Sequence, residues 1–292
     1  MRHEPAAPAA ADHAAELHAN GYCILRSALP ADAVAAFDRS LAAAFAETPF
    51  SDGGFYGART KRFGRVLARA PDADRFVRHP AMLALAEDAL GPWCDTLQLN
   101  LTQAIAVHPG ALPQLPHRDQ DMWRGQIGET EYLINVMWPF TEYRAGNGAT
   151  LVWPGSHGAA ALADPRDAPP LVAEMDPGDA LVFLGSTLHG AGGNRSQHVR
   201  RGMIVSYCLG WLKPYENQWL AYPPEIARGF PRELAALVGY RQHRPNLGNY
   251  EGRCPSLLLE DAADGPLGAA DALRPDQAVQ VEAYVAAQRA QP

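Results

Sequence analysis

The sequence predicts a mainly β protein whose core is a sandwich or barrel of short strands, with helices packed outside it. Three observations predict this class. Apolar and polar residues alternate over 96–107, shorter apolar runs recur between turn residues from 132 to 209, and helical spacing appears on either side of this region. Short strands divided by turns are typical of a sandwich or barrel.

The N-terminal third is predicted to be largely helical. A helix ends at Asn20-Gly21, a common C-terminal stop, and another begins at Pro30, which suits the first turn of a helix. In this second helix Val34 and Phe37 recur at helical spacing and are expected in the core. The predicted elements are a helix over 11–20, a strand over 22–25, and helices over 30–46, 72–78 and 80–90.

A glycine-rich segment over 49–60 separates these helices and carries the aromatic residues Phe55 and Tyr56. Such a segment is either a mobile surface loop or a lid over a site. The cations at 61–65 are able to contact an anionic ligand, but a solvated face is the expected place for them.

The β core is predicted over 95–212. Asn147-Gly148 is a strong turn signal that leads into a strand. The predicted strands cover 96–107, 132–140, 149–153, 180–184 and 201–209, and helical pieces follow near 215–220, 223–228, 231–239 and 276–289. Because no domain boundary is visible, residues 1–292 are expected to form a single domain. It comprises a helical region over 1–94, the core over 95–212 and a second helical region over 213–292.

Composition and charge argue against several classes of protein. The chain has 292 residues and a formal net charge of -7, which argues against a nucleic-acid-binding surface. No stretch approaches the roughly 18 apolar residues of a membrane span, and the N-terminus lacks the apolar run of a signal peptide. Four scattered cysteines without a C-x-x-C pair fit a reducing compartment. A cytoplasmic protein without nucleic-acid or membrane partners is expected.

His117 and Asp119 form the main candidate site. They follow the 96–107 strand, and residues two apart in an extended backbone point to the same face. An imidazole and a carboxylate suit iron, zinc or manganese, and His189, just beyond the 180–184 strand, is the expected third ligand. Arg200 begins the next strand, so antiparallel pairing can bring it to the same end of one cavity as His189. An isolated H-x-D pair arises by chance and depends on this context.

Several motifs together resemble the phytanoyl-CoA dioxygenase family, from the strand at Gly21-Tyr22 to about residue 260. The motifs are His117-x-Asp119, Asn147-Gly148-Ala149-Thr150, Pro154-Gly155-Ser156-His157, Gly178-Asp179-x-Leu181-x-Phe183, His189 and Arg200. Tyr215-Glu216-Asn217-Gln218 and Leu237-x-Gly239-Tyr240 resemble the branch that tailors microbial secondary metabolites. The family resemblance implies a double-stranded β-helix, which is a jelly-roll or cupin-like core. It also implies a single oxygenase domain that uses iron(II), 2-oxoglutarate and O2.

The resemblance also implies roles for individual residues. His117, Asp119 and His189 match the iron ligands and catalytic residues, a set that leaves positions on iron(II) open for 2-oxoglutarate and O2. Arg200 matches the arginine that grips the far carboxylate of 2-oxoglutarate through two parallel hydrogen bonds. The adjacent Arg201 replaces it if the strand register shifts by one residue. The other candidates for the cosubstrate pocket are Gln114, Thr150, Gln103 and Trp123, the last facing the site if the strand continues beyond Asp119.

The implied reaction is the hydroxylation of an unactivated C–H bond in a metabolite, with decarboxylation of 2-oxoglutarate to succinate and CO2. Phe55, Tyr56 and Trp219 are among the aromatic residues expected around the pocket, and they favour a bulky, largely apolar small molecule. Desaturation and ring formation stay open as outcomes, as do a monomer and a homodimer. Halogenation is disfavoured because Asp119 occupies the position where halogenating relatives carry a small residue.

Three other classes of protein fit part of the pattern. His117-Arg118-Asp119 also resembles a kinase catalytic loop, but Arg124 stands where a kinase has asparagine and no glycine-rich phosphate loop is present. A zinc hydrolase accepts the same three ligands but does not need Arg200. A non-enzymatic jelly-roll binding module tolerates the loss of any one ligand, whereas the whole set is present here.

Overall fold

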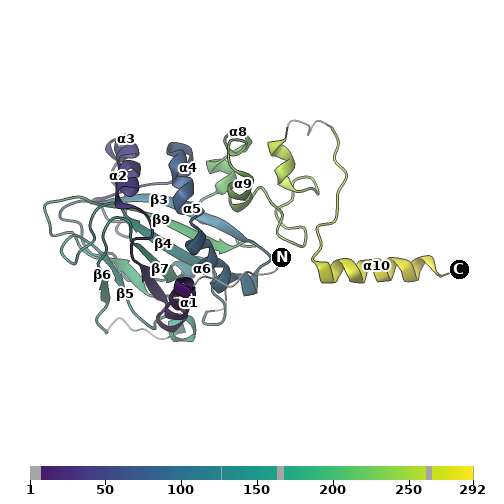
Figure 1. Ribbon diagram of the computed structural model, residues 1–292, viewed down its shortest axis with the longest axis horizontal. Helices are drawn as coiled ribbons and strands as arrows, with labels where there is room; N and C mark the ends of the chain where they lie inside the picture. The colour runs from purple at the N-terminus through teal and green to yellow at the C-terminus, as the bar shows by residue number, and fades with distance from the viewer. Residues whose placement is uncertain (1–7, 126, 163–167, 261–264, 292) are drawn as a thin grey trace.

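The computed structural model describes residues 8–125, 127–162, 168–260 and 265–291, and two antiparallel sheets form its centre (Figure 1). The larger sheet has the strand order β1-β7-β4-β9-β3-β2, and the smaller sheet has the order β6-β5-β8. The strands are β1 Tyr22–Leu25, β2 Thr60–Phe63, β3 Leu97–Val107, β4 Leu133–Pro139, β5 Thr150–Val152, β6 Leu171–Ala173, β7 Ala180–Leu184, β8 His189–Ala191 and β9 Arg200–Leu209. This arrangement confirms the predicted mainly β fold with flanking helices.

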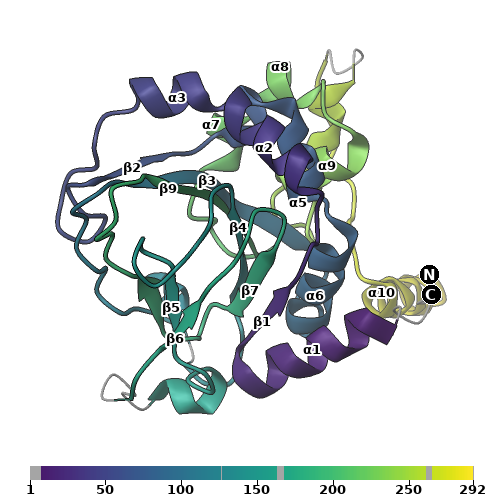
Figure 2. The same ribbon diagram turned by 60° about the vertical axis from the view of Figure 1, so that its left-hand side comes forward.

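Helices cover one face of the larger sheet, and the smaller sheet lies on the other (Figure 2). Helix α1 contacts β1, and α6 contacts β3, β4 and β9. The helices are α1 Pro8–Asn20, α2 Ala31–Ser40, α3 Ala42–Glu47, α4 Val66–Arg69, α5 Asp74–Val77, α6 Pro80–Leu90, α7 Gln218–Ala221, α8 Pro224–Ala227, α9 Arg232–Leu237 and α10 Pro275–Arg289.

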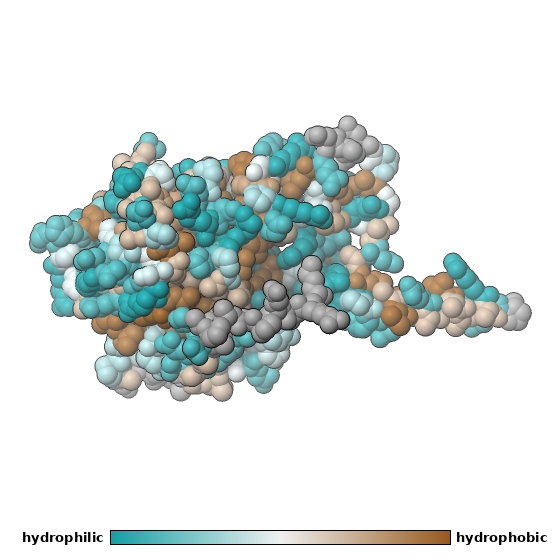
Figure 3. All heavy atoms as spheres, in the orientation of Figure 1, coloured by the Kyte–Doolittle hydropathy of each residue, from teal (hydrophilic) through white to brown (hydrophobic). Residues whose placement is uncertain are grey.

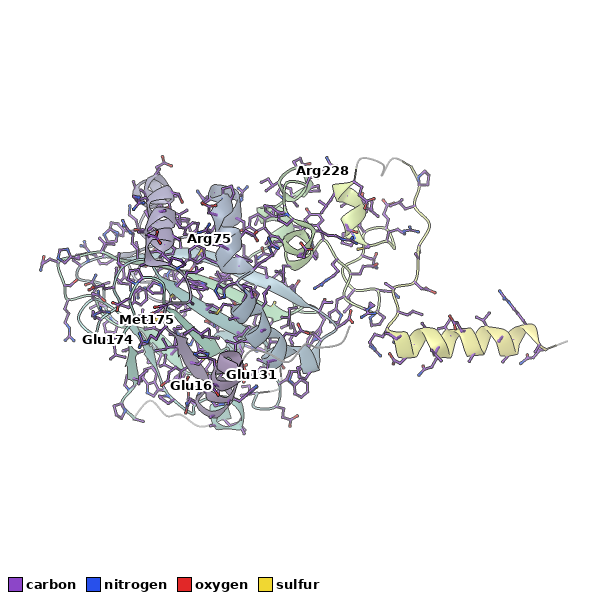
Figure 4. All side chains as sticks on the ribbon, in the orientation of Figure 1. Glu16, Arg75, Glu131, Glu174, Met175 and Arg228 are labelled. Carbon is purple, nitrogen blue, oxygen red and sulfur yellow. The ribbon has the colours of Figure 1, made fainter. Side chains whose placement is uncertain are left out.

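Side chains on the larger sheet alternate between its two faces, as a pleated strand requires. On β9, Met203 and Val205 belong to the large apolar core that the helices share, whereas Ile204 belongs to a smaller apolar cluster between the sheets. This inner cluster also contains Met137, Tyr143, Met175, Leu181 and Phe183, of which Met175 is labelled in Figure 4. The side chains of the candidate site lie on this inner face.

Three local predictions differ from the structure. The helix predicted over 30–46 is divided at Leu41, whose N–H bonds to Asp38 O, into α2 and α3. The cations at 61–65 are expected on a solvated face, but residues 60–63 form β2 and pair with β3. Strands β6 and β8 are outside the predicted set because three residues carry too little alternation to identify a strand.

The chain after β9 consists of short helices and an irregular segment. Arg228, labelled in Figure 4, donates from Nε and Nη2 to Leu258 O, and Arg244 forms an ion pair with Asp95 beside β3. Helix α10 extends beyond the rest of the molecule (Figure 3), where hydrophilic and apolar residues are interspersed on the visible face. Within the described ranges, no helix combines the length and apolar character needed to cross a membrane.

Candidate active site

Three potential metal ligands meet between the two sheets. His117 and His189 form an antiparallel bridge in which each N–H donates to the other's carbonyl oxygen, at 2.9 and 3.0 Å. The centroids of their imidazole rings lie 4.5 Å apart. The carboxylate oxygens of Asp119 lie 3.4 Å from His117 Nε2 and 3.6 Å from His189 Nε2. Among the described residues, these form the one group of three whose potential ligand atoms all lie within 4.8 Å of one another.

The extended backbone that contains His117 ends at Asp119. Arg118 is extended, with φ -117° and ψ 125°, and Asp119 begins the 3-10 turn Asp119–Met122. The Arg118 guanidinium donates to Ser186 O at 2.9 Å and to Ser156 O at 3.3 Å, which ties the segment to neighbouring loops. The same-face geometry expected of His117 and Asp119 is therefore present, although the strand does not continue past them.

Hydrogen bonds fix the tautomers of both histidines. His117 Nδ1 lies 2.8 Å from Leu115 O, and His189 Nδ1 lies 3.0 Å from Thr187 O. Because a carbonyl oxygen accepts and cannot donate, Nδ1 carries the proton in each neutral ring and Nε2 keeps its lone pair. Both Nε2 atoms lie beside Asp119, which is the arrangement that a metal ion requires.

Burial and nearby charges set the protonation of these residues. Burial lowers the pKa of His189 to about 4, so its imidazole is neutral near pH 7. Burial opposes ionisation of Asp119, but the two histidines and a hydrogen bond from Asn135 outweigh it and lower the pKa of this carboxyl to about 2. Burial also opposes protonation of His117, yet Asp119 raises the pKa of this imidazole. An ionised carboxylate therefore stands between two imidazoles, and a divalent cation would offset its charge.

These residues lie in the wall of a cavity of about 400 Å³. Six of the predicted pocket residues also line it, namely Phe55, Tyr56, Gln103, Gln114, Thr150 and Arg200. Gln114 comes from the loop before His117, and its Oε1 accepts a hydrogen bond from Ala191 N at 3.3 Å. The structure thus brings together residues that are up to about 150 positions apart in the chain.

The two adjacent arginines of β9 lie on opposite faces of the sheet. Arg200 is 2% exposed and lines the cavity, where Nη1 donates to Tyr143 Oη at 3.0 Å and Nη2 donates to Gly148 O. Arg201 faces outward and forms an ion pair with Asp38 on α2. The strand register therefore assigns Arg200, and not Arg201, to the cavity.

Two further residues lie at the site: Arg62, one of the cations expected on a solvated face, and Asn135, which is outside the predicted set. Arg62 on β2 lines the cavity, donates from Nη1 to Gln103 Oε1 at 3.1 Å, and lies over the Tyr56 ring. Burial lowers the pKa of its guanidinium. Asn135 on β4 donates to Asp119 Oδ2 at 3.0 Å. The available sequence signal for Asn135 is that it is a polar residue in the otherwise apolar run Leu133–Pro139.

Two predicted pocket residues lie elsewhere. Trp123 follows the 3-10 turn Asp119–Met122. Its side chain does not line the cavity, and its indole N–H donates to Lys213 O at 2.9 Å. The turn changes the direction of the chain, so the parity that would have aimed Trp123 at the site is lost. Trp219 on α7 is 49% exposed, donates to Gly239 O and is also absent from the cavity lining.

The segment over 49–60 covers one side of the cavity. The Phe55 ring lies 4.8 Å from the His117 ring, centroid to centroid, in an edge contact. The Tyr56 hydroxyl contacts the hydroxyl of Tyr215, which follows β9 and also lines the cavity. These contacts agree with the lid interpretation of this segment.

Comparison with known proteins identifies related sequences. Residues 17–202 match the family model described as Phytanoyl-CoA dioxygenase (PhyH). The protein named Dioxygenase cdmD, from Talaromyces verruculosus, is 35% identical over 197 residues, which cover 63% of this chain and 63% of that protein. The matched stretch therefore spans a little less than two thirds of this relative's length.

Solved structures share the fold at low sequence identity. The epimerase SnoN, described in complex with Fe3+, alpha ketoglutarate and nogalamycin RO, has a TM-score of 0.59 and 18% identity, covering 92% of this chain and 97% of SnoN. The non-haem alpha ketoglutarate dependent carbocyclase SnoK from nogalamycin biosynthesis has a TM-score of 0.55 and 18% identity, covering 68% of this chain and 83% of SnoK. These likenesses confirm the jelly-roll core. Because the family model matches more than half of the sequence, the chain belongs to the phytanoyl-CoA dioxygenase family.

Proposed function

We propose that the protein is an iron(II)- and 2-oxoglutarate-dependent dioxygenase that hydroxylates an unactivated C–H bond of a bulky, largely apolar small molecule. The observation that carries the proposal is the convergence of His117, Asp119 and His189 on the wall of a cavity that also contains Arg200. Membership of a dioxygenase family supports the reaction class, and the SnoN complex with Fe3+ and alpha ketoglutarate supports the choice of metal and cosubstrate.

The donor set fits iron(II). Two imidazole Nε2 lone pairs and one ionised carboxylate are suitable ligands for this metal, and three protein ligands leave coordination positions open. When bound, iron(II), 2-oxoglutarate and O2 supply chemistry that decarboxylates 2-oxoglutarate to succinate and CO2 and oxidises a substrate C–H bond. A zinc hydrolase accepts the same ligands, but it has no need of the buried guanidinium of Arg200 in the same cavity.

Arg200 is proposed to hold the far carboxylate of 2-oxoglutarate. Its bonds to Tyr143 Oη and Gly148 O fix the plane of the guanidinium, while its buried Nε–H has no partner among the described residues. A buried N–H group without an acceptor is unfavourable, and a carboxylate would satisfy it with a paired hydrogen bond. Gln114 and Thr150 line the same cavity and are proposed as further contacts of the cosubstrate.

The apolar part of the cavity is proposed to receive the substrate. Phe55 lies over His117, and Leu101, Met137 and Ile204 add apolar surface from the inner face of the larger sheet. These side chains exclude water from the space beside the metal ligands and favour an apolar compound. Phe55 and Tyr56 are the proposed substrate contacts from the 49–60 segment, whereas Trp219 lies outside the cavity lining.

Ring formation is a second candidate outcome, because SnoK, which shares the fold, is described as a carbocyclase. Desaturation needs the same ligand set and is also an outcome of the test. A non-enzymatic binding module is disfavoured, because the three ligands, their fixed tautomers and the buried Arg200 are all present together.

The proposal covers the chain as a single oxygenase domain. One apolar core runs from Leu17 on α1 to Tyr240 beyond α9 and includes residues from the strands between them, which supports one folding unit. The four cysteines are free in the structure, which supports the proposed cytoplasmic location. We propose that the protein acts on a small molecule as a monomer or homodimer, without nucleic-acid or membrane partners.

The experiment that tests this function is an anaerobic titration of the metal-free protein with Fe(II) and 2-oxoglutarate. A weak visible absorption band is expected for the wild type and is expected to be absent from Asp119→Ala. Candidate apolar metabolites are then screened for stimulated release of succinate, and product analysis distinguishes hydroxylation from desaturation and ring formation. A wild-type protein that gives neither the band nor succinate would refute the proposal.

A further inference from the structure

We propose that Asn135 is a positioning residue of the metal centre, which holds the carboxylate of Asp119 in the orientation that metal binding requires. This inference rests on the proposed function, because it concerns how the chain prepares one of the three metal ligands. It adds a residue that bonds to one of these ligands and is not itself part of the cavity lining.

The position of Asn135 in the fold makes it a rigid donor. It lies on β4 between the flanking strands β7 and β9, with Phe183 and Ser206 opposite it in the strand register. The side chain is fully buried, and its Nδ2 donates to Asp119 Oδ2 at 3.0 Å. A donor on a central strand moves less than one on a loop, so it is suited to fixing a ligand on the less regular 117–122 segment.

The orientation of the amide follows from its acceptor. The Asn135 amide nitrogen donates to Asp119 Oδ2, so the Asn135 carbonyl oxygen faces away from this carboxylate. That oxygen, Oδ1, is buried and has no hydrogen-bond partner among the described residues. An unpaired buried oxygen opposes stability, so an apolar side chain would suit this strand better if packing were the whole role of the position.

The consequence for Asp119 is a restricted carboxylate. Oδ2 is held by Asn135, while Oδ1 lies beside His117 Nε2 at 3.4 Å. Without the amide, the carboxylate can rotate about its Cβ–Cγ bond and present a different oxygen geometry between the two imidazoles. Groups that orient metal ligands in this way typically change metal affinity by about 10- to 100-fold when they are removed.

The test measures metal binding without relying on catalysis. Metal-free wild type, Asn135→Leu and Asn135→Asp are titrated anaerobically with Co(II), and the visible spectrum of the bound ion is recorded as a report on its ligand geometry. Leucine removes the amide at similar size, and aspartate keeps the shape but replaces the donor by an acceptor. Ser206→Ala is the matched control, because Ser206 is equally buried and lies opposite Asn135, but its hydroxyl accepts a hydrogen bond from Asn100 instead of bonding to Asp119.

Both Asn135 variants are expected to bind Co(II) about 10- to 100-fold more weakly, with a changed visible spectrum, while Ser206→Ala stays within about twofold of the wild type. If Asn135→Leu does not fold, the isosteric Asn135→Asp decides the question. Folded variants with wild-type affinity and spectrum would overturn the inference, as would an equal loss in Ser206→Ala. If the Asn135 inference fails but the wild type binds Co(II), the proposed metal site still stands. If the wild type binds no Co(II), both the proposed metal site and the Asn135 inference are refuted.

Discussion

Arg200→Lys gives the sharpest test of how the cavity binds 2-oxoglutarate. A guanidinium has five N–H donors, and in Arg200 Tyr143 Oη and Gly148 O each accept from one of them. Three donors therefore remain, including the buried Nε–H that has no partner among the described residues. Such a fork can make two parallel bonds to a carboxylate. Lysine keeps the positive charge but cannot reproduce this planar pair.

The expected magnitude follows from the loss of one bond. A hydrogen bond to a charged group contributes about 1.5–3 kcal/mol, and about 1.4 kcal/mol corresponds to a tenfold change in Kd. Arg200→Lys should therefore raise the Kd for 2-oxoglutarate about 10- to 150-fold. The buried position makes the effect large, because Arg200 is 2% exposed and bulk water does not screen it.

The assay is a titration of the Fe(II)-loaded protein with 2-oxoglutarate, followed through the visible band, so that no substrate is needed. Arg201→Lys is the matched control, because its side chain lies on the outer face beside Asp38. Its Kd for 2-oxoglutarate should equal that of the wild type. If Arg200→Lys binds 2-oxoglutarate normally and Arg201→Lys does not, the assignment of the two arginines to the two faces is wrong.

Three more predictions follow from the same geometry. The pKa of His117 is raised, so a proton should compete with Co(II) for His117 Nε2 and Co(II) binding should weaken as the pH falls through this pKa. Equal Co(II) affinities at about pH 7 and about pH 5.5 would contradict this prediction. Phe55→Ala should raise the KM for substrate roughly tenfold and increase succinate release without product, whereas Phe50→Ala, whose ring packs against His108 instead, should change neither. Arg201→Leu should lower the free energy of unfolding by about 1–3 kcal/mol, because it leaves the buried Asp38 without its ion pair. Burial already raises the folded-state pKa of Asp38, and losing Arg201 raises it further, so this destabilisation should be greater at about pH 8 than at about pH 5 in thermal unfolding.

The longer strands could be predicted because their patterns are local, whereas the short strands β2, β6 and β8 could not. The strand expected over 96–107 is observed as Leu97–Val107, and that expected over 132–140 as Leu133–Pro139. The choice between Arg200 and Arg201 could not be made in this way. Alternation places Arg201 on the face of Met203 and Val205, but both faces of the strand are buried, and the sequence does not say which one packs against helices.

The pairing of His117 with His189 is also beyond a local pattern. It depends on an isolated bridge between residues 72 positions apart, and on the His117 side the chain turns into a 3-10 helix at Asp119. The two ligands could be proposed from their residue types and from the family resemblance. The prediction that Trp123 faces the cavity is wrong because the chain turns before it. The 3-10 turn that begins at Asp119 has no clear signal in the sequence Asp-Gln-Asp-Met.

Asn100 shows how an apparently regular pattern can conceal a change of face. Leu97, Leu99 and Leu101 suggest uninterrupted alternation, yet the register passes from Leu99 opposite Tyr207 to Leu101 opposite Ser206, so Asn100 is the extra residue of a β-bulge.

The bulge moves the later residues of β3 to the opposite face. Leu97 and Leu99 belong to the core beside the helices, whereas Leu101 and Ile105 belong to the inner cluster and line the cavity. Asn100 itself accepts a hydrogen bond from Tyr215 N at 2.7 Å through Oδ1. One inserted residue therefore turns the later half of β3 toward the cavity and anchors the segment that brings Tyr215 to the cavity. This explains why β3 forms this end of the site although the sequence of β3 looks like that of an ordinary strand.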